Sequence, residues 1–303
     1  MIGMKRRKGT TSDMIRPVTW KIAGGRVLGP APFFVVGIVN CTPDSFYDGG
    51  RCFDSQAAIS HSLELLEQGA DIVDVGGEST RPFSQRVSIE CERDRVLPVL
   101  GGVLQQVPQA VVSVDTYRAE VAAEALQAGA TIVNDVSACS LDPELIQVLV
   151  DYKPGYVLMH SRGRPENMQK DPSYRDVVGE IYSFFESTMN RLVQAGLPQE
   201  CIVLDPGIGF GKLLQHNLEL LANIEDFYAL DRPIYMGLSN KSMWTKLLNV
   251  ALNERCMATQ VATGLLAAKG VPIHRVHEVD HTVRTLRIVQ AMQEQVKGGK
   301  NGR

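Results

Sequence analysis

Residues 111–136 read VVSVDTYRAEVAAEALQAGATIVNDV. Two short apolar runs, at 111–115 and 131–135, are joined by a segment at 119–129 whose apolar residues recur with helical period. Each run is rich in valine or isoleucine and turns polar only at its end, which is typical of a strand buried on both faces of a parallel sheet. Gly129 stands where the helix would need a left-handed C-terminal residue. The stretch therefore predicts a strand–helix–strand unit with parallel strands.

The same alternation recurs along the chain and predicts an α/β fold. Eight apolar runs have the length of strands, and segments of helical period separate most of them. The runs lie at 33–39, 71–75, 111–115, 131–135, 155–160, 201–205, 232–237 and 271–276. The other helical segments lie at 57–69, 144–151 and 176–196. Eight such units favour a closed (β/α)8 TIM barrel, although an open, doubly wound sheet fits the same runs.

The two ends of the chain differ from its middle. Residues 1–14 carry the basic run MKRRK without a following apolar segment, which predicts a disordered terminus rather than a secretory signal. Residues 18–29, around a Gly-Gly pair, predict a short N-terminal β-hairpin that covers the bottom of the barrel. We expect residues 15–293 to form a single domain because no Pro/Gly/Ser-rich linker interrupts them, and residues 294–303 to form a disordered tail.

Composition and charge narrow the function classes. With 44% hydrophobic and 21% charged residues among 303, the chain has the composition of a globular protein with a sizeable core. Its net charge of −3 gives no basic field that would favour nucleic acid or a membrane surface as a partner. Six cysteines without a CxxC pair predict reduced thiols and a cytoplasmic location. We therefore expect small molecules, and neither nucleic acid nor a membrane, as binding partners.

Polar side chains gather where the predicted strands end. In a closed barrel these ends meet at one mouth, where the active sites of this fold lie. Any single Asp or Asn there could instead cap the next helix. A whole set is harder to explain in that way, because unpaired polar groups inside a barrel cost ~1 to 3 kcal/mol each. The set, which predicts a polar ligand, comprises Asn40, Asp74, Asp115, Asn134, Asp135, His160, Asp205, Ser239, Lys241, Arg275 and His277.

The chemistry of these side chains divides the predicted mouth in two. Acceptors suited to a ring that bears amino and N–H groups come from Asp74, Asp115, Asn134, Asp135 and Asp205. Lys241, Arg275 and His277, later in the chain, suit a phosphate or a carbonyl. Phosphate sites in barrels frequently form on the loops after strands seven and eight. A donor-rich heterocycle that carries a phosphate fits both halves.

Two motif look-alikes do not change this interpretation. The stretch DPGIGFGK at 205–212 is one residue short of Walker A spacing and lacks the Ser or Thr that should follow its lysine. His274, His277 and His281 are spaced as metal ligands on a helix would be, but they span a predicted strand–helix junction, which breaks that geometry. We expect neither a nucleotide P-loop nor a zinc site.

Seven segments, in order and spread over residues 33 to about 290, resemble the signature segments of the bacterial dihydropteroate synthase family. They are NCTPDSFYDGG (40–50), DIVDVGGESTRP (71–82), SVDTYRAEVAAEALQAGATIVNDVSA (113–138), VLMHSRGRPENMQ (157–169), LDPGIGFGK (204–212), GLSNKS (237–242) and RVHEV (275–279). The resemblance implies a (β/α)8 barrel that condenses 6-hydroxymethyl-7,8-dihydropterin diphosphate with p-aminobenzoate. The products would be 7,8-dihydropteroate, used in folate biosynthesis, and pyrophosphate. It also implies Mg²⁺, an SN1-like mechanism, competition by sulfonamides and a homodimer, with residues 285–292 as a candidate interface.

The resemblance further implies roles for individual residues. The pterin would be bound by Asp74, Asp115, Asn134, Met159, Asp205, Phe210, Gly237 and Lys241. The diphosphate would be bound by Asn40, Arg81, Arg275 and His277, and Asn40 would also bind the metal. The p-aminobenzoate would be bound by Thr80, Arg81, Pro82 and Ser239. The catalytic residues would be Asp115, Asp205, Lys241 and Arg275. The first two βα loops would close over these sites.

Three positions depart from the family pattern. Asn240 replaces an arginine in the family's SRKS, Glu278 replaces an aspartate in RVHDV, and Cys41 replaces an apolar residue in the first loop. Asn240 has neither the charge nor the planar fork of an arginine. A pterin-binding paralogue without synthase activity is therefore one alternative. A methyltetrahydrofolate-dependent methyltransferase relative is another, although such a protein should lack the TPDSF and RVH segments that are present here.

Overall fold

A parallel sheet of eight strands lies at the centre of the computed structural model, which describes residues 17–42, 54–79, 86–163 and 172–298. The strands follow the order β8-β7-β6-β5-β4-β3-β10-β9. Their bounds are β3 (Phe34–Asn40), β4 (Ile72–Gly76), β5 (Val112–Asp115), β6 (Ile132–Asp135), β7 (Gly155–Met159), β8 (Ile202–Asp205), β9 (Tyr235–Gly237) and β10 (Ile273–Val276). A parallel bridge between Leu204 and Ile234 brings β8 beside β9. The sheet is thus a nearly closed barrel, and the predicted fold class is confirmed.

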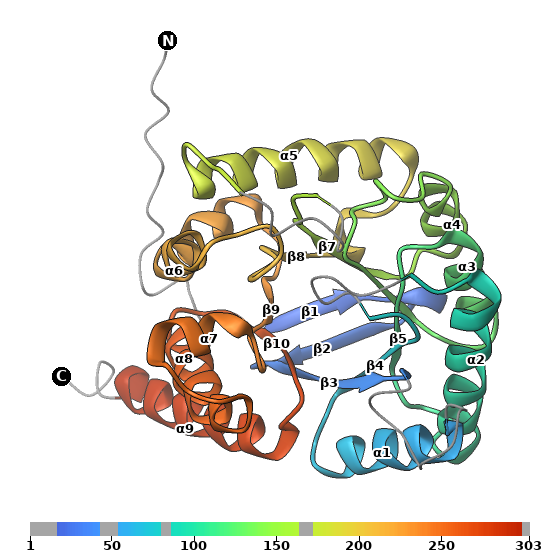
Figure 1. Cartoon of the computed structure of the whole chain (residues 1–303), viewed down its shortest axis with the longest axis horizontal. Coiled ribbons are helices and arrows are strands. Elements are labelled where there is room, and N and C mark those ends of the chain that lie inside the picture. Colours follow the sequence, from blue (N-terminus) through green and yellow to red (C-terminus); the bar gives the residue numbers. More distant parts are fainter. Residues whose placement is uncertain (1–16, 43–53, 80–85, 164–171, 299–303) are drawn as a thin grey trace.

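Helices surround this barrel (Figure 1). They are α1 (Ser55–Glu67), α2 (Ile89–Gln106), α3 (Ala119–Gln127), α4 (Leu145–Tyr152), α5 (Val177–Ala195), α6 (Leu214–Ala222), α7 (Ser242–Leu248), α8 (Arg255–Ala268) and α9 (Val279–Gly298), with short 3-10 turns at η3 (Gln199–Cys201), η4 (Ile224–Leu230) and η5 (Leu252–Glu254). Gly129 and Gly196 end α3 and α5 with φ angles of +110° and +118°, the left-handed conformation predicted for them. In the part of the chain that the structure describes, no helix is both long and apolar enough to cross a membrane.

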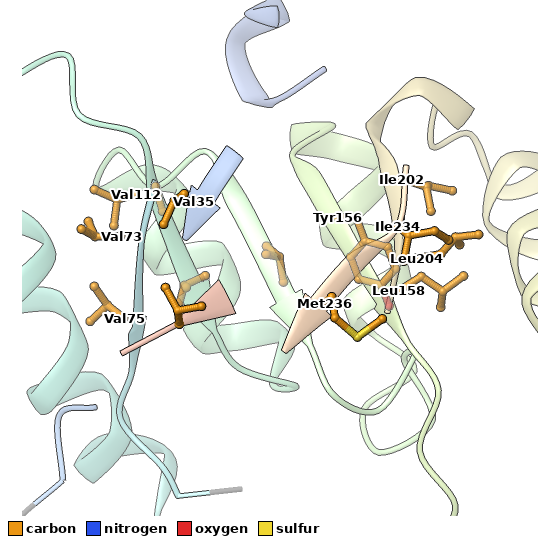
Figure 2. Close-up of a cluster of buried hydrophobic side chains, with 14 of the residues drawn as sticks. Val35, Val73, Val75, Val112, Tyr156, Leu158, Ile202, Leu204, Ile234 and Met236 are labelled. Atoms are coloured by element: carbon orange, nitrogen blue, oxygen red, sulfur yellow. The ribbon is translucent and has the colours of Figure 1, made fainter. Parts of the chain in front are cut away.

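Side chains alternate along each strand between two separate cores. Ile72 belongs to a core inside the barrel, whereas Val73 and Val75 belong to a larger core between the sheet and the helices. Figure 2 shows part of the larger core, with Val73, Val75 and Leu158 among the labelled side chains. This period of two decides which polar residues near the strand ends enter the barrel.

The predicted hairpin is present and covers the bottom of the barrel. Strands β1 (Val18–Lys21) and β2 (Val27–Ala31) are antiparallel and joined by η2 (Ala23–Gly25). Trp20 is 1% exposed, and its indole Nε1 donates to the carbonyl of Cys201 at 2.7 Å. The inner core that it joins includes Ile22, Phe34, Val36, Ile72, Ile132, Val157, Val203 and Ile273. The interior is therefore packed from below, and a ligand has to enter from the opposite end.

The structure changes one predicted boundary. Helix α9 continues to Gly298, so residues 294–298, which we predicted to belong to a disordered tail, are helical. Gln290 Nε2 donates to Glu294 Oε1 at 2.9 Å, an i,i+4 contact that supports the last turns. The remaining predicted disorder, at 1–14 and 299–303, lies outside the described residues.

Candidate active site

Strand register brings the predicted polar residues to one level inside the barrel. Asp115 on β5 is the register partner of Gly76 on β4 and of Asn134 on β6. On the other side of the barrel, Asp205 on β8 is paired with Met159, and Arg275 on β10 is paired with Gly237. Strand ends that are far apart in the sequence therefore form one ring at the mouth.

Arg275 connects two carboxylates at the centre of this ring. Its Nε donates to Asp74 Oδ2 at 2.6 Å, and its Nη2 donates to Asp115 Oδ2 at 2.7 Å. Asn134 Nδ2 donates to the same oxygen of Asp74 at 2.9 Å. Asp74 is fully buried, and the side chain of Arg275 is 21% exposed. Two buried carboxylates thus share a single guanidinium.

The surroundings of Asp115 raise the pKa of its carboxyl group. Burial raises the pKa of Asp115 to about 7, the negative charge of Asp74 adds to the rise, and Arg275 opposes it. Burial also raises the pKa of Asp205, while a hydrogen bond from the Gly207 N–H and the charge of Lys241 act in the other direction. A ligand that brings N–H donors would favour the ionised carboxylates.

Some acceptors in this interior have no hydrogen-bond partner. Among the buried side chains in the described ranges, Oδ1 of Asp74 and Oδ1 of Asp115 accept no hydrogen bond, and Ser113 Oγ and Tyr235 Oη are likewise unpaired. An unsatisfied buried polar atom costs about 1–3 kcal/mol. Two carboxylate oxygens without partners at the ring's centre indicate a site for a ligand that donates hydrogen bonds.

An apolar wall lies beside these carboxylates. Met159 packs with Tyr117 and Val136, and Phe210 borders that cluster. The ammonium of Lys241 lies 4.2 Å from the centroid of the Phe210 ring. Gly237 leaves open space, because a Cβ built there would meet no atom within 4 Å. A flat aromatic ring would therefore have both an apolar surface and charged edges to contact.

Lys212 organises the loop that carries Phe210. Its buried ammonium donates to the carbonyls of Gly207 and Phe210, both at 3.0 Å, and of His160 at 3.2 Å. Burial lowers the pKa of Lys212 to about 7. Sequence reasoning set Lys212 aside as a failed P-loop lysine and missed this role, for which the glycine-rich turn before it was the only signal.

Comparisons with known proteins agree with this geometry. Residues 36–277 match the model of a family described as pterin binding enzyme. The dihydropteroate synthase of Escherichia coli K12 is 41% identical over 257 residues, which cover 85% of this chain and 90% of that protein. The corresponding protein of Bacillus subtilis is 38% identical over 265 residues, covering 88% of this chain and 90% of that one.

The chain belongs to the dihydropteroate synthase family of pterin-binding enzymes.

Solved structures of this family have the same architecture. A Yersinia pestis dihydropteroate synthase in complex with a sulfonamide drug has a TM-score of 0.84 at 39% identity, covering 90% of this chain and 98% of that one. A Xanthomonas albilineans dihydropteroate synthase with 4-aminobenzoic acid has a TM-score of 0.85 at 38% identity, covering 92% of this chain and 98% of that one. The same organism's dihydropteroate synthase in complex with 7,8-dihydropteroate has a TM-score of 0.81 at 35% identity, covering 91% and 99%. The resemblance inferred from the seven segments is confirmed.

Two residues expected at the mouth lie outside the barrel instead. Asp135 follows the inward-facing Asn134, so it points away from the interior and accepts from Ser137 N, Cys139 N and the Tyr156 hydroxyl. His160 packs edge-on against Phe184 of α5, with ring centroids 4.8 Å apart, and its Nδ1 lies 2.9 Å from Lys212 Nζ. Burial and the charge of Lys212 lower the pKa of His160 to about 2. Both residues shape loops and do not face the ligand site.

The three histidines with metal-like spacing have three different partners. His274 is buried outside the barrel, with Nε2 3.0 Å from the carbonyl of Val271. His277 contacts Ser239 at 2.8 Å, and His281 lies 3.4 Å from the sulfur of Cys256. The three side chains therefore have separate contacts.

The remaining predicted residues divide between described and undescribed segments. Thr80, Arg81 and Pro82 fall within 80–85, outside the described residues, and so does most of the first loop beyond Thr42. Ser239 is 7% exposed at the mouth, next to His277. Cys41 is completely buried in the outer core, where burial raises its pKa to about 12 and the thiol serves as a small apolar group.

A buried ion cluster, which sequence reasoning missed, anchors both sides of the second loop. Arg118 Nη2 donates to Glu78 Oε2 and to the carbonyl of Val87, both at 2.7 Å. Its Nη1 pairs with Glu92. Glu78 and Val87 flank segment 80–85, and Tyr117 also donates to Glu78 at 3.0 Å. The one signal in the sequence was the pair Tyr117-Arg118 directly after a buried strand.

Arg118→Met should lower the free energy of unfolding by about 3–5 kcal/mol, because Glu92 and Glu78 would stay buried without their cation. Arg93→Met is the matched control. Arg93 contacts Glu124 with both side chains 33% exposed, so its loss should cost at most about 1 kcal/mol. Urea unfolding measures both variants, and equal losses would contradict the role given to Arg118.

Proposed function

We propose that this chain condenses 6-hydroxymethyl-7,8-dihydropterin diphosphate with p-aminobenzoate to give 7,8-dihydropteroate and pyrophosphate. One observation carries the proposal: Asp74 Oδ1 and Asp115 Oδ1 lie unpaired inside the mouth, where the amino and N–H groups of a pterin would supply the missing donors. Family relatives with 4-aminobenzoic acid or 7,8-dihydropteroate bound support the choice of cosubstrate and product.

The pterin ring would lie between the acceptors and the apolar wall. Its polar edge would form hydrogen bonds with Asp115, Asn134 and Asp205, and Asp74 would lie at the side of the ring. Met159 and Phe210 would cover its face. Lys241 would donate to the ring's carbonyl or nitrogen edge from its position over Phe210, and the open space at Gly237 would admit the ring.

The mechanism follows from the charges. The C–O bond to the diphosphate would break first, and both bonding electrons would leave with the diphosphate. The carboxylates of Asp115 and Asp205 offset the positive charge that develops on the pterin, while Arg275 and His277 hold the departing group. The amine of p-aminobenzoate then forms the new C–N bond and sheds its proton. No strong base is needed from the protein, because an arylamine that has attacked a cation is acidic.

Asn40 would hold Mg²⁺ together with the diphosphate. Asn40 ends β3 and is the register partner of Gly76 on β4, which is in turn the register partner of Asp115 on β5. Its amide oxygen would therefore lie at the rim of the same ring. A single hard oxygen ligand fits Mg²⁺, which usually takes one or two protein oxygens and completes its shell with phosphate and water. When bound, Mg²⁺ would neutralise charge on the diphosphate.

A turnover assay tests the function. Purified protein with Mg²⁺, dihydropterin diphosphate and p-aminobenzoate should release pyrophosphate and form 7,8-dihydropteroate in equal amounts. Tight pterin binding without product would instead identify the synthase-inactive paralogue, the alternative motivated by Asn240. Methyl transfer from methyltetrahydrofolate would identify the methyltransferase relative.

We further propose that the chain is a cytoplasmic homodimer. The cysteines in the described ranges are all unpaired, in keeping with a reducing compartment. Helices α8 and α9 lie side by side (Figure 1), joined by Thr285 Oγ1 donating to Gln260 Oε1 at 2.9 Å. Large apolar side chains on their outer surface are more than half exposed: Met257, Val261, Leu265, Ile288 and Met292. A face of this kind suits a second copy of the chain.

Val261→Glu should convert the dimer to a monomer in sedimentation velocity experiments, because a charge would be buried at the centre of this face. Val193→Glu, on the distant helix α5 and also exposed, is the matched control and should leave the dimer intact. A dimer that persists in Val261→Glu would place the interface elsewhere.

A further inference from the structure

The residues after β9 and β10 form a hydrogen-bonded group at the rim of the barrel mouth. Ser239 follows β9, and His277 and Glu278 follow β10, its neighbour in the sheet. Ser239 Oγ lies 2.8 Å from His277 Nδ1 and 3.0 Å from Glu278 Oε2. Asn240 Nδ2 donates to Glu278 Oε1 at 3.3 Å. Asn240 and Glu278, two of the three departures from the family pattern, therefore contact each other.

The single proton of Ser239 decides the tautomer of His277. An ionised carboxylate only accepts hydrogen bonds, so the Ser239 hydroxyl donates to Glu278 Oε2. Ser239 Oγ then has its lone pairs for two donors, of which the backbone N–H of His277 is one, at 3.2 Å. Two atoms lie near His277 Nδ1: Ser239 Oγ at 2.8 Å and the donor Asn240 Nδ2 at 3.4 Å. The shorter contact dominates, and because the Ser239 proton is already given to Glu278, it makes Nδ1 the second donor to Ser239 Oγ. His277 therefore carries a proton on Nδ1.

Asn240 completes the group by satisfying the second carboxylate oxygen. Its backbone is left-handed, with φ +58°, and its carbonyl accepts from Arg255 Nη1 at 2.7 Å. These constraints direct Nδ2 toward Glu278 Oε1. An aspartate at 278 would be shorter by one carbon–carbon bond, about 1.5 Å, and would not reach both Ser239 and Asn240 from the same backbone. The side chain of Glu278 is therefore long enough to contact the neutral side chain of Asn240.

We propose that Glu278 is a positioning residue for His277: acting through Ser239, it holds the imidazole with a proton on Nδ1, so that Nε2 meets the diphosphate. To donate from Nε2 to a phosphate oxygen, the ring must then carry both protons and a positive charge. The proton on Nδ1 is inferred from the hydrogen-bond contacts and does not depend on the function. The contact between Nε2 and the diphosphate rests on the proposed synthase function.

The first test reads the tautomer without any substrate. In protein labelled with ¹⁵N-histidine, at a pH where His277 is neutral, long-range ¹H–¹⁵N spectra should show its proton on Nδ1; loss of the signal in His277→Gln assigns it. Glu278→Met releases the Ser239 hydroxyl to donate to Nδ1, so the ring proton should move to Nε2. Glu278→Gln, whose amide oxygen still accepts from Ser239, should retain the Nδ1 proton and serves as the conservative rescue.

The pathway through Ser239 has its own control. In a Ser239→Ala background, Glu278→Met should no longer move the proton, because the hydroxyl that connects the two side chains is absent. An Nε2 proton in the wild type, an unchanged tautomer in Glu278→Met, or a switch that persists without Ser239 would each overturn the proposal. Thermal unfolding of each variant confirms that the compared proteins are folded.

The second test measures the consequence in the turnover assay. Glu278→Met should raise KM for the dihydropterin diphosphate by about tenfold, because a neutral Nε2–H would replace the charged donor of the wild type, and a charged hydrogen bond is roughly twice as strong as a neutral one. The value of kcat should change by less than about twofold. Asp280→Asn, which removes an exposed carboxylate two residues further along, is the matched control and should have no effect.

The two tests separate the two claims. A switched tautomer with an unchanged KM for the diphosphate substrate would show that Nε2 does not meet the diphosphate, and would overturn that half of the proposal. Absence of turnover in the wild type would count against the synthase function and leave the measured tautomer standing.

Discussion

Asp115→Asn should lower kcat by at least about tenfold in a protein that remains folded. The substitution keeps the shape of the side chain but removes the charge that offsets the positive pterin. Asp115 is 8% exposed and shares Arg275 with Asp74, so one carboxylate would still pair with the guanidinium. The measurement is kcat at saturating substrates, together with the urea midpoint. Asp151→Asn, on the exposed surface of α4, is the control.

The same carboxylate predicts a pH dependence. Because burial raises the pKa of Asp115 to about 7, the ionised acceptor is lost as the pH falls through that value. In the wild type, kcat/KM for the dihydropterin diphosphate should therefore decline below about pH 7. In Asp115→Asn this decline should be absent. An unchanged kcat in the variant would show that the carboxylate does not have the assigned role.

Arg275→Ala should raise KM for the dihydropterin diphosphate by roughly 10- to 100-fold, the loss expected for a charged hydrogen-bond donor. Arg275 is the cation at the centre of the ring, 2.6 Å from Asp74 and 2.7 Å from Asp115. Its removal would also leave these buried carboxylates without a partner, so the unfolding free energy has to be measured in parallel.

Arg275→Lys separates the two effects. It retains the charge but cannot donate to both carboxylates in the geometry of a guanidinium. We expect an intermediate KM and a smaller loss of stability than in the alanine variant. A change confined to KM for p-aminobenzoate, in either variant, would contradict the assignment of Arg275 to the diphosphate.

The eight strands could be predicted because each is a short apolar run that ends in polar residues. Which of two neighbouring polar residues faces the barrel interior could not be predicted. Asn134 and Asp135 are adjacent, and only one of them can face the interior; the register with Asp115 places Asn134 inside. On a strand with both faces buried, the apolar pattern has no period of two to show which residue points inward.

Contacts between side chains that are distant in the sequence could not be predicted either. The cluster of Arg118 with Glu78 and Glu92 joins residues 40 and 26 positions apart. The contact between Asn240 and Glu278 spans 38 positions. From the sequence alone, Asn240 motivated an alternative without synthase activity, and Glu278 carried no functional expectation. In the structure they compensate in shape, because the longer acid reaches the shorter amide.

The central claim is that the unpaired carboxylate oxygens inside the mouth receive the N–H groups of a pterin. A crystal structure with 7,8-dihydropteroate bound tests it most directly. The account predicts hydrogen bonds from the pterin ring to Asp115 and Asp205, the ring against Met159 and Phe210, and the aminobenzoate end toward Ser239. A pterin bound outside the barrel mouth, with Asp115 Oδ1 still lacking a donor, would contradict the account.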